Sequence, residues 1–369
     1  MIYLDSGATS MHKPGTVLKA VHWAMKCCAN PGRGGHEASM AASRVVYTCR
    51  ERAARMFGCK PEQVVFTSNC THGLNIAIKS IIKPGSPVAV SGFEHNAVMR
   101  PLYALGAKIT VCGRKLFDRE DTLQAFETAL KKGVDAVVCT HVSNVFGYIL
   151  PVEDIAKRCA AYGVPFILDA AQSAGTLPVG LDRLKAAYVA MPGHKGLLGP
   201  QGTGLLLCAE KGNPLIYGGT GNNSLEKVMP EELPERLEAG TLNVPGIAGL
   251  SAGLAYLDQR GIENIHHAEC MQARRCAAGL KELGCTVFDG ADQGGTVSFL
   301  PGGDCEEAAA FLADRGIAVR PGYHCAPLAH ESAGTLNTGT VRVSFGHTAN
   351  HRETDRFLEM MRCWRADVM

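Results

Sequence analysis

The chain has 369 residues, of which 46% are hydrophobic and 20% charged, and it carries 15 cysteines. At roughly 150 residues per domain this length predicts two domains, which excludes a small disulfide-stapled scaffold, and the ordinary apolar content excludes a disordered chain. Lysine and arginine number 37 against 35 aspartates and glutamates, without a long run of like charge, so we expect a small, neutral ligand and no nucleic acid.

The cysteines indicate a reducing environment. The N-terminus lacks a basic start followed by an apolar stretch, and no segment offers about 18 uninterrupted apolar residues, so we expect a cytoplasmic protein without a membrane partner. Thiols stay reduced there. No Cys-x-x-Cys pair occurs, which argues against a metal site, and most cysteines are expected to be small buried hydrophobes.

Short apolar runs alternate with amphipathic stretches between about residues 60 and 210. This alternation predicts an α/β fold, with a largely parallel sheet of seven strands covered by helices. The expected strands are 64–68, 87–91, 108–112, 135–140, 164–169, 186–190 and 204–209, and helices are expected at 72–82, 121–132 and 151–162.

The C-terminal third has a different pattern. Glycine, asparagine and proline cluster after about residue 212 and predict a long loop. Beyond Pro245 two helices are expected first, followed by strand, helix and strand patterns, which predicts a second, smaller α+β domain. The helices are expected at 246–260, 263–283 and 304–316, and the strands at 295–299, 317–320 and 340–345.

The strongest chemical signal is a lysine between glycines, Lys195, which follows a predicted strand. A lysine is usually a solvated surface charge, but Asp169 ends an apolar strand, and a buried aspartate must be paired, cap a helix or face a cationic ligand. A lysine that forms a Schiff base and an aspartate that holds a pyridinium nitrogen are the two groups that a pyridoxal phosphate enzyme needs.

Two further segments lie where predicted strands end. The hydroxyl-rich run 67–73 precedes a helix and can either cap it or bind a phosphate through backbone N–H groups. His95 follows the strand at 87–91, where it is either an ordinary hydrogen-bonded histidine or a flat ring that stacks on a planar cofactor.

Over essentially its whole length the chain resembles the class V aminotransferases, and within them the cysteine desulfurases and selenocysteine lyases. The resemblance implies the pyridoxal phosphate-dependent transferase fold, with a large domain at 14–245 and a small domain formed by 1–13 and 246–369. Nine segments match in the family's order: 3–9 (YLDSGAT), 68–75 (SNCTHGLN), 94–97 (EHNA), 141–147 (HVSNVFG), 166–172 (FILDAAQ), 193–204 (GHKGLLGPQGTG), 238–243 (EAGTLN), 320–325 (RPGYHC) and 341–344 (VRVS).

The resemblance implies specific cofactor contacts. Lys195 would bind the cofactor covalently, Asp169 would pair with its pyridine nitrogen, Gln172 would donate to its phenolic oxygen, and His95 would stack on its ring. The phosphate would be bound by Thr71, His72 and His194, and by Thr241 from the neighbouring subunit of a homodimer. Asn144 and Arg342 would hold the substrate carboxylate, the latter through its guanidinium fork. Family members often have a hydroxyl residue where this chain has Pro192, so one phosphate bond would be missing or supplied otherwise.

Cys325 is the residue that selects a reaction. It lies between prolines on a glycine-containing loop, beside His324 and near Arg320, basic neighbours that can stabilise a thiolate. In the desulfurases a cysteine in this setting attacks the substrate sulfur, which implies that L-cysteine is converted to L-alanine and leaves a persulfide on Cys325. The spacing of 17 positions from Cys325 to Arg342 resembles the branch with a short cysteine loop, for which a sulfur-acceptor protein is expected.

Three alternatives remain open at this point. A selenocysteine lyase would use the same residues on L-selenocysteine. A C–S lyase would release pyruvate and ammonia instead of alanine. A pyridoxal phosphate-binding carrier or regulatory protein would hold the cofactor without turnover.

Overall fold

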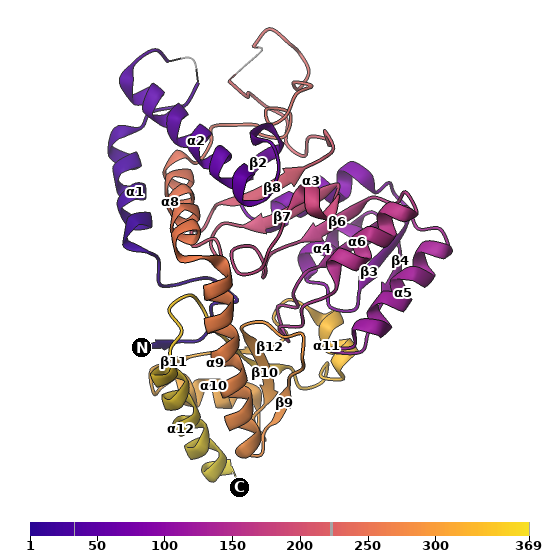
Figure 1. Ribbon diagram of the computed structural model, residues 1–369, viewed down its shortest axis with the longest axis vertical. Coiled ribbons are helices and arrows are strands. Elements are labelled where there is room, and N and C mark those ends of the chain that lie inside the picture. The colour runs from indigo at the N-terminus through magenta and orange to yellow at the C-terminus, as the bar shows by residue number, and fades with distance from the viewer. Residues whose placement is uncertain (33, 222–223, 369) are drawn as a thin grey trace.

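A seven-stranded sheet organises the larger part of the molecule (Figure 1). The structure is a computed structural model that describes residues 1–32, 34–221 and 224–368. The strand order is β2-β8-β7-β6-β5-β3-β4, and β8 runs antiparallel to both of its neighbours while the other described pairs in the sheet are parallel. The strands are β2 (Val64–Thr67), β3 (Pro87–Ser91), β4 (Lys108–Cys112), β5 (Ala136–Thr140), β6 (Phe166–Asp169), β7 (Tyr188–Pro192) and β8 (Gly204–Cys208).

Helices cover both faces of this sheet, which is why its inner strands are continuous apolar runs. Successive residues alternate between two cores: Val64 and Phe66 belong to one, and Val65 belongs to the other. The predicted seven-stranded, mostly parallel sheet is therefore confirmed. The covering helices are α3 (Cys70–Ile81), α4 (Asn96–Ala104), α5 (Arg119–Lys131), α6 (Val152–Ala161) and the short α7 (Leu181–Leu184), and a 3-10 turn, η1 (Pro61–Gln63), precedes β2.

Three helices of the larger part pack against one another: α1 (Gly15–Cys27), α2 (Glu37–Met56) and α8 (Val244–Arg260). Leu250 and Leu254 of α8 belong to the same core as the sheet strands. Gly253 brings α8 against the segment that follows Lys195, because a Cβ at this position would lie 2.4 Å from the carbonyl oxygen of Leu197. The domain boundary expected at 245 stays a prediction, and this packing leads us to propose a boundary near Gly261, after α8.

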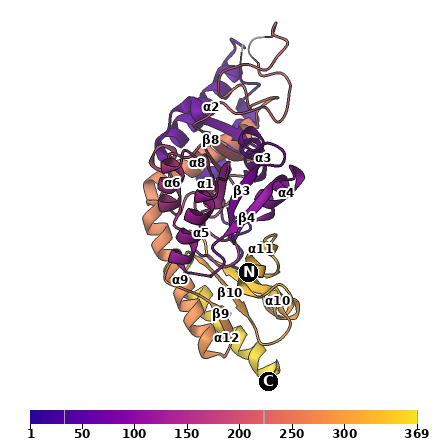
Figure 2. The same cartoon turned by 90° about the vertical axis from the view of Figure 1, so that its right-hand side faces the viewer.

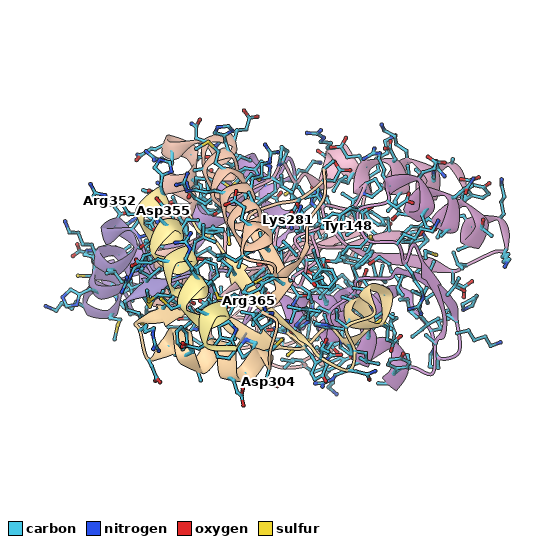
Figure 3. All side chains as sticks on the ribbon, turned by 90° about the horizontal axis from the view of Figure 1, so that it is seen from below. Tyr148, Lys281, Asp304, Arg352, Asp355 and Arg365 are labelled. Atoms are coloured by element: carbon cyan, nitrogen blue, oxygen red, sulfur yellow. The ribbon has the colours of Figure 1, made fainter. Side chains whose placement is uncertain are left out.

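The smaller part is built on a four-stranded antiparallel sheet of order β12-β13-β10-β9, which Figure 2 shows below β3 and β4. Its strands are β9 (Thr286–Phe288), β10 (Thr296–Leu300), β12 (Arg320–Gly322) and β13 (Thr340–Ser344). Its helices are α9 (Ile262–Glu282), α10 (Cys305–Ala313), α11 (Pro327–Ala333) and α12 (His351–Val368). Figure 3 shows α12, which carries Asp355 and Arg365, alongside α9, which carries Lys281.

The N-terminus belongs with this smaller part. Strand β1 (Ile2–Tyr3) pairs in parallel with β11 (Ile317–Ala318), and Asp5 bridges to Ser344 of β13. Residues 6–10 then lead from there to the segment around Lys195, where Ser10 Oγ donates to the carbonyl oxygens of His194 and Lys195. The N-terminal segment thus connects the two parts of the fold at the place where the lysine lies.

The cysteines follow the expected distribution in large part. All fifteen lie in the described ranges and none is in a disulfide, and ten of them are buried. Cys27, Cys325 and Cys363 are the exposed ones. Over the described ranges no cluster of three or more metal-ligating side chains occurs, and none of the described helices is long and apolar enough to cross a bilayer.

Candidate active site

A pocket of about 230 Å³ lies where β5, β6 and β7 end at their carboxyl termini, the edge at which open α/β sheets bind ligands. The N-terminal segment and the loop after β12 close it from the other side. It brings together nine of the residues expected from the sequence: Thr71, His95, Asn144, Asp169, Gln172, His194, Lys195, Cys325 and Arg342.

Lys195 and Asp169 lie at the base of this pocket. Burial lowers the pKa of Lys195, and the Arg342 guanidinium lowers it further, which favours the neutral, nucleophilic amine. Burial raises the pKa of Asp169. The amide of Ala171 at 2.9 Å and the thiol of Cys70 at 3.4 Å both donate to its Oδ1. Because no described donor reaches Oδ2, that oxygen is available to a cationic group in the pocket.

His95 is held as a neutral acceptor at the start of α4. Its Nδ1 accepts from the amide of Ala97 at 3.0 Å, and burial lowers the pKa of His95 to about 4. The adjacent Glu94 is fully buried, and its Oε1 accepts from the amide of Thr140 at 2.8 Å and from the Ser91 hydroxyl. Burial raises the pKa of Glu94 to about 8. The Glu94 carboxyl thus links the end of β3 to the end of β5, next to His95 in the chain.

The N-terminus of α3 and the loop before Lys195 form the end of the pocket that suits a phosphate. Asn69 caps the helix by accepting from the amide of His72 at 2.9 Å, and the exposed Thr71 lies in its first turn. His194 faces it from the other side, with its Nδ1 at 3.1 Å from Thr9 Oγ1. A helix N-terminus with a hydroxyl and an imidazole nearby is a suitable anion site. Pro192 lines the pocket here but has no hydrogen-bond donor.

His72 and Thr241 are the two expected phosphate ligands that do not line this pocket. They line a neighbouring pocket instead, together with Ser68 and the segment 238–243. The cap at Asn69 fixes the amide of His72, and its ring Nδ1 accepts from the amide of Ser68 at 3.3 Å, so the side chain is engaged on that side of α3. Their phosphate roles stay predictions. For Thr241 the expected role was in a second subunit, so its distance from the pocket of its own chain is compatible with that role.

Arg342 is buried beside the pocket and bonded on two sides. One guanidinium nitrogen lies 2.5 Å from Oδ1 of Asp5, and the other donates to the carbonyl oxygen of Asn144 at 2.9 Å. Burial lowers the pKa of Arg342, although the Asp5 carboxylate opposes that change. A substrate carboxylate would therefore meet a guanidinium that already has an anionic partner.

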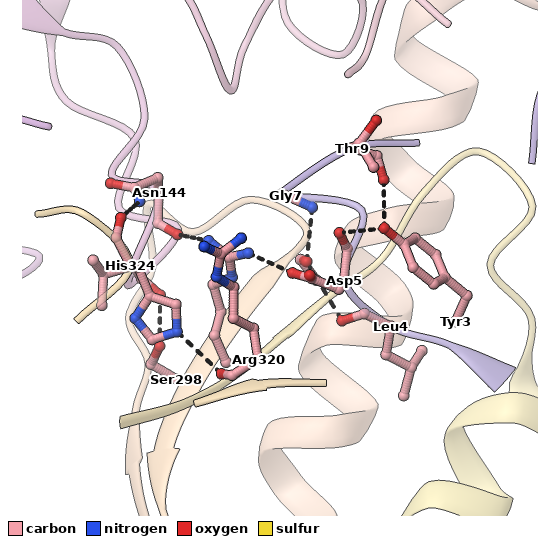
Figure 4. Close-up of polar contacts among 12 residues, drawn as sticks. Tyr3, Leu4, Asp5, Gly7, Thr9, Asn144, Ser298, Arg320 and His324 are labelled. Carbon is pink, nitrogen blue, oxygen red and sulfur yellow. Dashed lines mark hydrogen bonds and ion pairs between the residues drawn. The ribbon is translucent and has the colours of Figure 1, made fainter. Parts of the chain in front are cut away.

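Cys325 is an exposed residue in the loop between β12 and α11, and it lines the pocket. The Asn144 side-chain amide donates to the carbonyl oxygen of His324 at 2.7 Å, as Figure 4 shows. His324 itself is buried, and its Nε2 lies 3.1 Å from the carbonyl oxygen of Arg320. Burial lowers the pKa of His324 to about 3, so the ring is neutral and its Nε2–H can donate to that carbonyl. His324 supports the loop and brings no positive charge to the thiol.

Gln172 bridges the pocket to the N-terminal segment, because its Nε2 donates to the carbonyl oxygen of Gly7 at 3.0 Å. A side-chain amide has two N–H donors, and the second is available for the phenolic oxygen expected from the resemblance.

Several residues of the site were missed by the sequence reasoning. Asp5, Cys70, Glu94 and Asn96 all lie within matched segments or beside them, yet their partners come from distant parts of the chain. Glu94 stands between Phe93 and His95, so its local sequence did not indicate that it would be buried. For Asp5 and Asn96 no signal existed, because nothing local indicates the residue that each contacts.

Comparison with known proteins identifies the family. The family model named Aminotransferase class-V matches residues 2–357. This chain belongs to the class V aminotransferase family. A probable cysteine desulfurase of Pyrococcus abyssi is 33% identical, with 98% of this chain and 93% of the relative covered. A cysteine desulfurase of Haloferax volcanii is 30% identical, with 97% and 88% covered. The apo structure of the cysteine desulfurase from Thermococcus onnurineus NA1 has a TM-score of 0.93 at 34% identity, with 99% and 95% covered.

These matches confirm the predicted family, its cysteine desulfurase branch and the dependence on pyridoxal phosphate. The side chains that line the pocket also fit that cofactor, independently of the comparisons. Oδ2 of Asp169 is available to a pyridinium nitrogen, the amine of Lys195 suits a Schiff base, and the first turn of α3 with His194 suits the phosphate.

Proposed function

We propose that Lys195 and Cys325 together convert L-cysteine into L-alanine and retain the sulfur as a persulfide on Cys325. The observation that carries this proposal is the presence, in one pocket, of a partly buried lysine, a buried aspartate with an available oxygen, and an exposed thiol. The thiol distinguishes a sulfur-transferring site from that of an ordinary transaminase.

The residues divide the reaction among them. Asp169 and His95 would hold the cofactor ring, Gln172 its phenolic oxygen, and Thr71 with His194 its phosphate. The bound cofactor supplies an electron sink for the carbanion at the substrate Cα. Lys195 removes the Cα proton and later returns a proton to carbon.

Sulfur transfer is a nucleophilic displacement by Cys325. Its thiolate attacks the substrate sulfur, an S–S bond forms, and the C–S bond breaks with its electron pair left on carbon. That carbon is protonated and becomes the methyl group of alanine. One L-cysteine and one Cys325 thiol thus give one L-alanine and one Cys325 persulfide, and no external oxidant is needed.

The test is product analysis with the wild-type protein on L-cysteine and on L-selenocysteine. Alanine without pyruvate, together with a gain of one sulfur on the peptide that contains Cys325, is the expected result. Pyruvate and ammonia without a persulfide would identify a C–S lyase, and alanine formed only from L-selenocysteine would identify a selenocysteine lyase. Bound cofactor without any product would identify a carrier or regulatory protein.

The lysine is tested separately. Lys195→Ala is expected to lose the absorbance band of lysine-bound pyridoxal phosphate, and a persistent band would refute its assignment. The substrate carboxylate is assigned to Asn144 and Arg342. The Asn144 amide has a second N–H for the substrate while the first donates to His324, whereas Arg342 must share its guanidinium between the substrate and Asp5.

The assembly we propose is a homodimer in which Thr241 of each chain completes the phosphate site of the other. Large apolar side chains are exposed on α1 and on the segments 214–221 and 224–228, among them Met25 at 71%, Tyr217 at 75% and Leu225 at 100%. Exposed apolar surface of this kind indicates a partner, and a second copy is the one that would also bring Thr241. A protein that accepts the outer persulfide sulfur from the exposed Cys325 is a further proposed partner.

A mixed dimer tests the shared site. One subunit carries Lys195→Ala and the other carries Thr241→Ala. If Thr241 acts across the interface, one of the two sites regains a wild-type lysine and a wild-type threonine, so activity exceeds that of either parent dimer. Activity no greater than that of the parents would place Thr241 outside the partner's site.

A further inference from the structure

The loop that carries Cys325 contains two consecutive residues in the left-handed region. His324 has φ +53° and Cys325 has φ +56°, and neither is a glycine. Non-glycine residues rarely adopt this conformation, and two in succession persist only when the surrounding structure holds them. Contacts with the surrounding fold must therefore hold the backbone of Cys325 in this unfavourable conformation.

Both carbonyl groups of this dipeptide accept hydrogen bonds from the larger part of the fold. The carbonyl oxygen of His324 accepts from the Asn144 side chain at 2.7 Å. The carbonyl oxygen of Cys325 accepts from the backbone amide of Asn96 at 2.8 Å. Asn144 lies in the loop after β5, and Asn96 is the first residue of α4, whose amide has no partner within its own helix.

The remaining supports of the loop come from the smaller part. The ring of His324 stacks on that of His330 of α11, with centroids 5.8 Å apart and planes at 12°. The amide of Ala326 closes a turn onto the carbonyl oxygen of Tyr323 at 2.9 Å. These contacts hold the ends of the loop. Among the described residues of the smaller part, none donates a hydrogen bond to the carbonyl oxygens of His324 and Cys325.

We propose that the side chain of Asn144 and the amide of Asn96 form a clamp that positions the Cys325 thiol for sulfur transfer. The clamp reaches from the larger part of the fold to a loop of the smaller part, so the position of the nucleophile depends on how the two parts meet. Asn96 and Asn144 act here as positioning residues. The proposal rests on the proposed function, because positioning has a catalytic meaning only if Cys325 is the nucleophile.

The critical variant is Asn96→Pro, which removes the backbone N–H together with the asparagine side chain. Proline is well tolerated at the first position of a helix, and the preceding residue, His95, has φ −78° and ψ 157°, which is compatible with a following proline. The acceptor Nδ1 of His95 keeps its bond to Ala97. Asn96→Ala is the matched control, because it removes the side chain and keeps the N–H that the clamp uses.

Two measurements on the holoenzyme test whether the clamp positions Cys325. Hydrogen exchange at the Ala326 amide, followed by mass spectrometry without substrate, should accelerate at least threefold in Asn96→Pro and remain as in wild type in Asn96→Ala. In steady-state kinetics with L-cysteine, kcat should fall about tenfold in Asn96→Pro with KM and the cofactor absorbance unchanged. A merely structural defect would alter KM and cofactor binding as well.

Unchanged exchange in Asn96→Pro overturns the proposal, and so does faster exchange with an unchanged kcat. Should this variant fail to fold, Asn144→Ala removes the other donor, and exchange at Ala326 should again accelerate; wild-type exchange there would overturn the clamp. The failure of the proposed function has a different signature. Wild-type protein would then form no alanine from L-cysteine, while the exchange measurements would still show whether the two donors order the loop.

Discussion

The guanidinium of Arg342 lies 2.5 Å from the carboxylate of Asp5, which is 337 positions away in the chain. The side chain of Arg342 is 2% exposed and that of Asp5 is 19% exposed, so the pair is largely withdrawn from water. It attaches the N-terminal segment to β13 directly beside the pocket.

Removal of the Asp5 charge should destabilise the fold. In Asp5→Asn the buried guanidinium loses its counter-ion, and the free energy of unfolding should fall by about 3 kcal/mol in urea denaturation. Asp355→Asn is the control, because Asp355 pairs with Arg275 at 2.7 Å where both side chains are about half exposed, and it should cost less than about 1 kcal/mol. Equal losses in the two variants would refute the role assigned to burial.

A second buried ion pair anchors the segment that carries Thr241. Arg50 binds both carboxylate oxygens of Glu238 at 2.9 Å, and Glu238 also accepts from the amide of Phe66. Arg50→Ala leaves that carboxylate buried without a cation, at a cost of about 3 to 5 kcal/mol in denaturant unfolding. Cofactor affinity should weaken too, because the segment 238–243 loses its anchor. Arg183→Ala, which breaks the exposed pair with Glu153, should change stability by less than about 1 kcal/mol.

Glu269 gives the stability a dependence on pH. It is 8% exposed, it has no hydrogen-bond partner among the described residues, and it lines a small cavity together with Lys195, His266 and His347. Burial raises the pKa of Glu269 to about 8. The folded protein therefore binds a proton that the unfolded chain releases above its ordinary pKa, and stability should fall as the pH rises from about 4.5 to about 8.

Glu269→Gln should remove this dependence. Variant and wild type should unfold with similar free energies near pH 4, and the variant should be more stable at pH 8 by on the order of 3 kcal/mol. Chemical denaturation at a series of pH values measures the difference. Glu282→Gln, at an exposed position of the same helix, serves as the control. A constant difference between Glu269→Gln and wild type across this range would show that Glu269 is not protonated in the fold.

Cys325→Ala should separate binding from sulfur transfer. The Cys325 side chain is exposed, so its loss should change the free energy of unfolding by less than about 0.5 kcal/mol. The variant should keep the absorbance of lysine-bound cofactor and still respond to added L-cysteine, but it should form no persulfide. Alanine release at the wild-type rate would refute the nucleophilic role. Cys363→Ala, which removes another exposed thiol, should keep full activity.

The residue pattern alone predicted the large sheet and the chemistry of its carboxyl edge. Apolar runs located all seven strands of the large sheet to within about two residues. The inner strands are covered on both faces, so their pattern depends only on their own residues, and the edge strand β4 alternates between exposed and partly buried positions. Lys195, Asp169 and His95 were found for the same reason, since each follows or ends such a strand. The resemblance to the class V aminotransferases then supplied their roles.

Which distant groups contact these side chains is visible only in the folded molecule. The partners of Arg342 and of the Cys325 loop come from segments that the local pattern does not connect. His72 could not be separated from Thr71 by sequence either, because adjacent helix residues point in different directions and only the packing of α3 shows which one lines the pocket. Periodicity shows on which face of a helix or strand a residue lies. The residues that it contacts from distant segments depend on how those segments pack together, which no local pattern encodes.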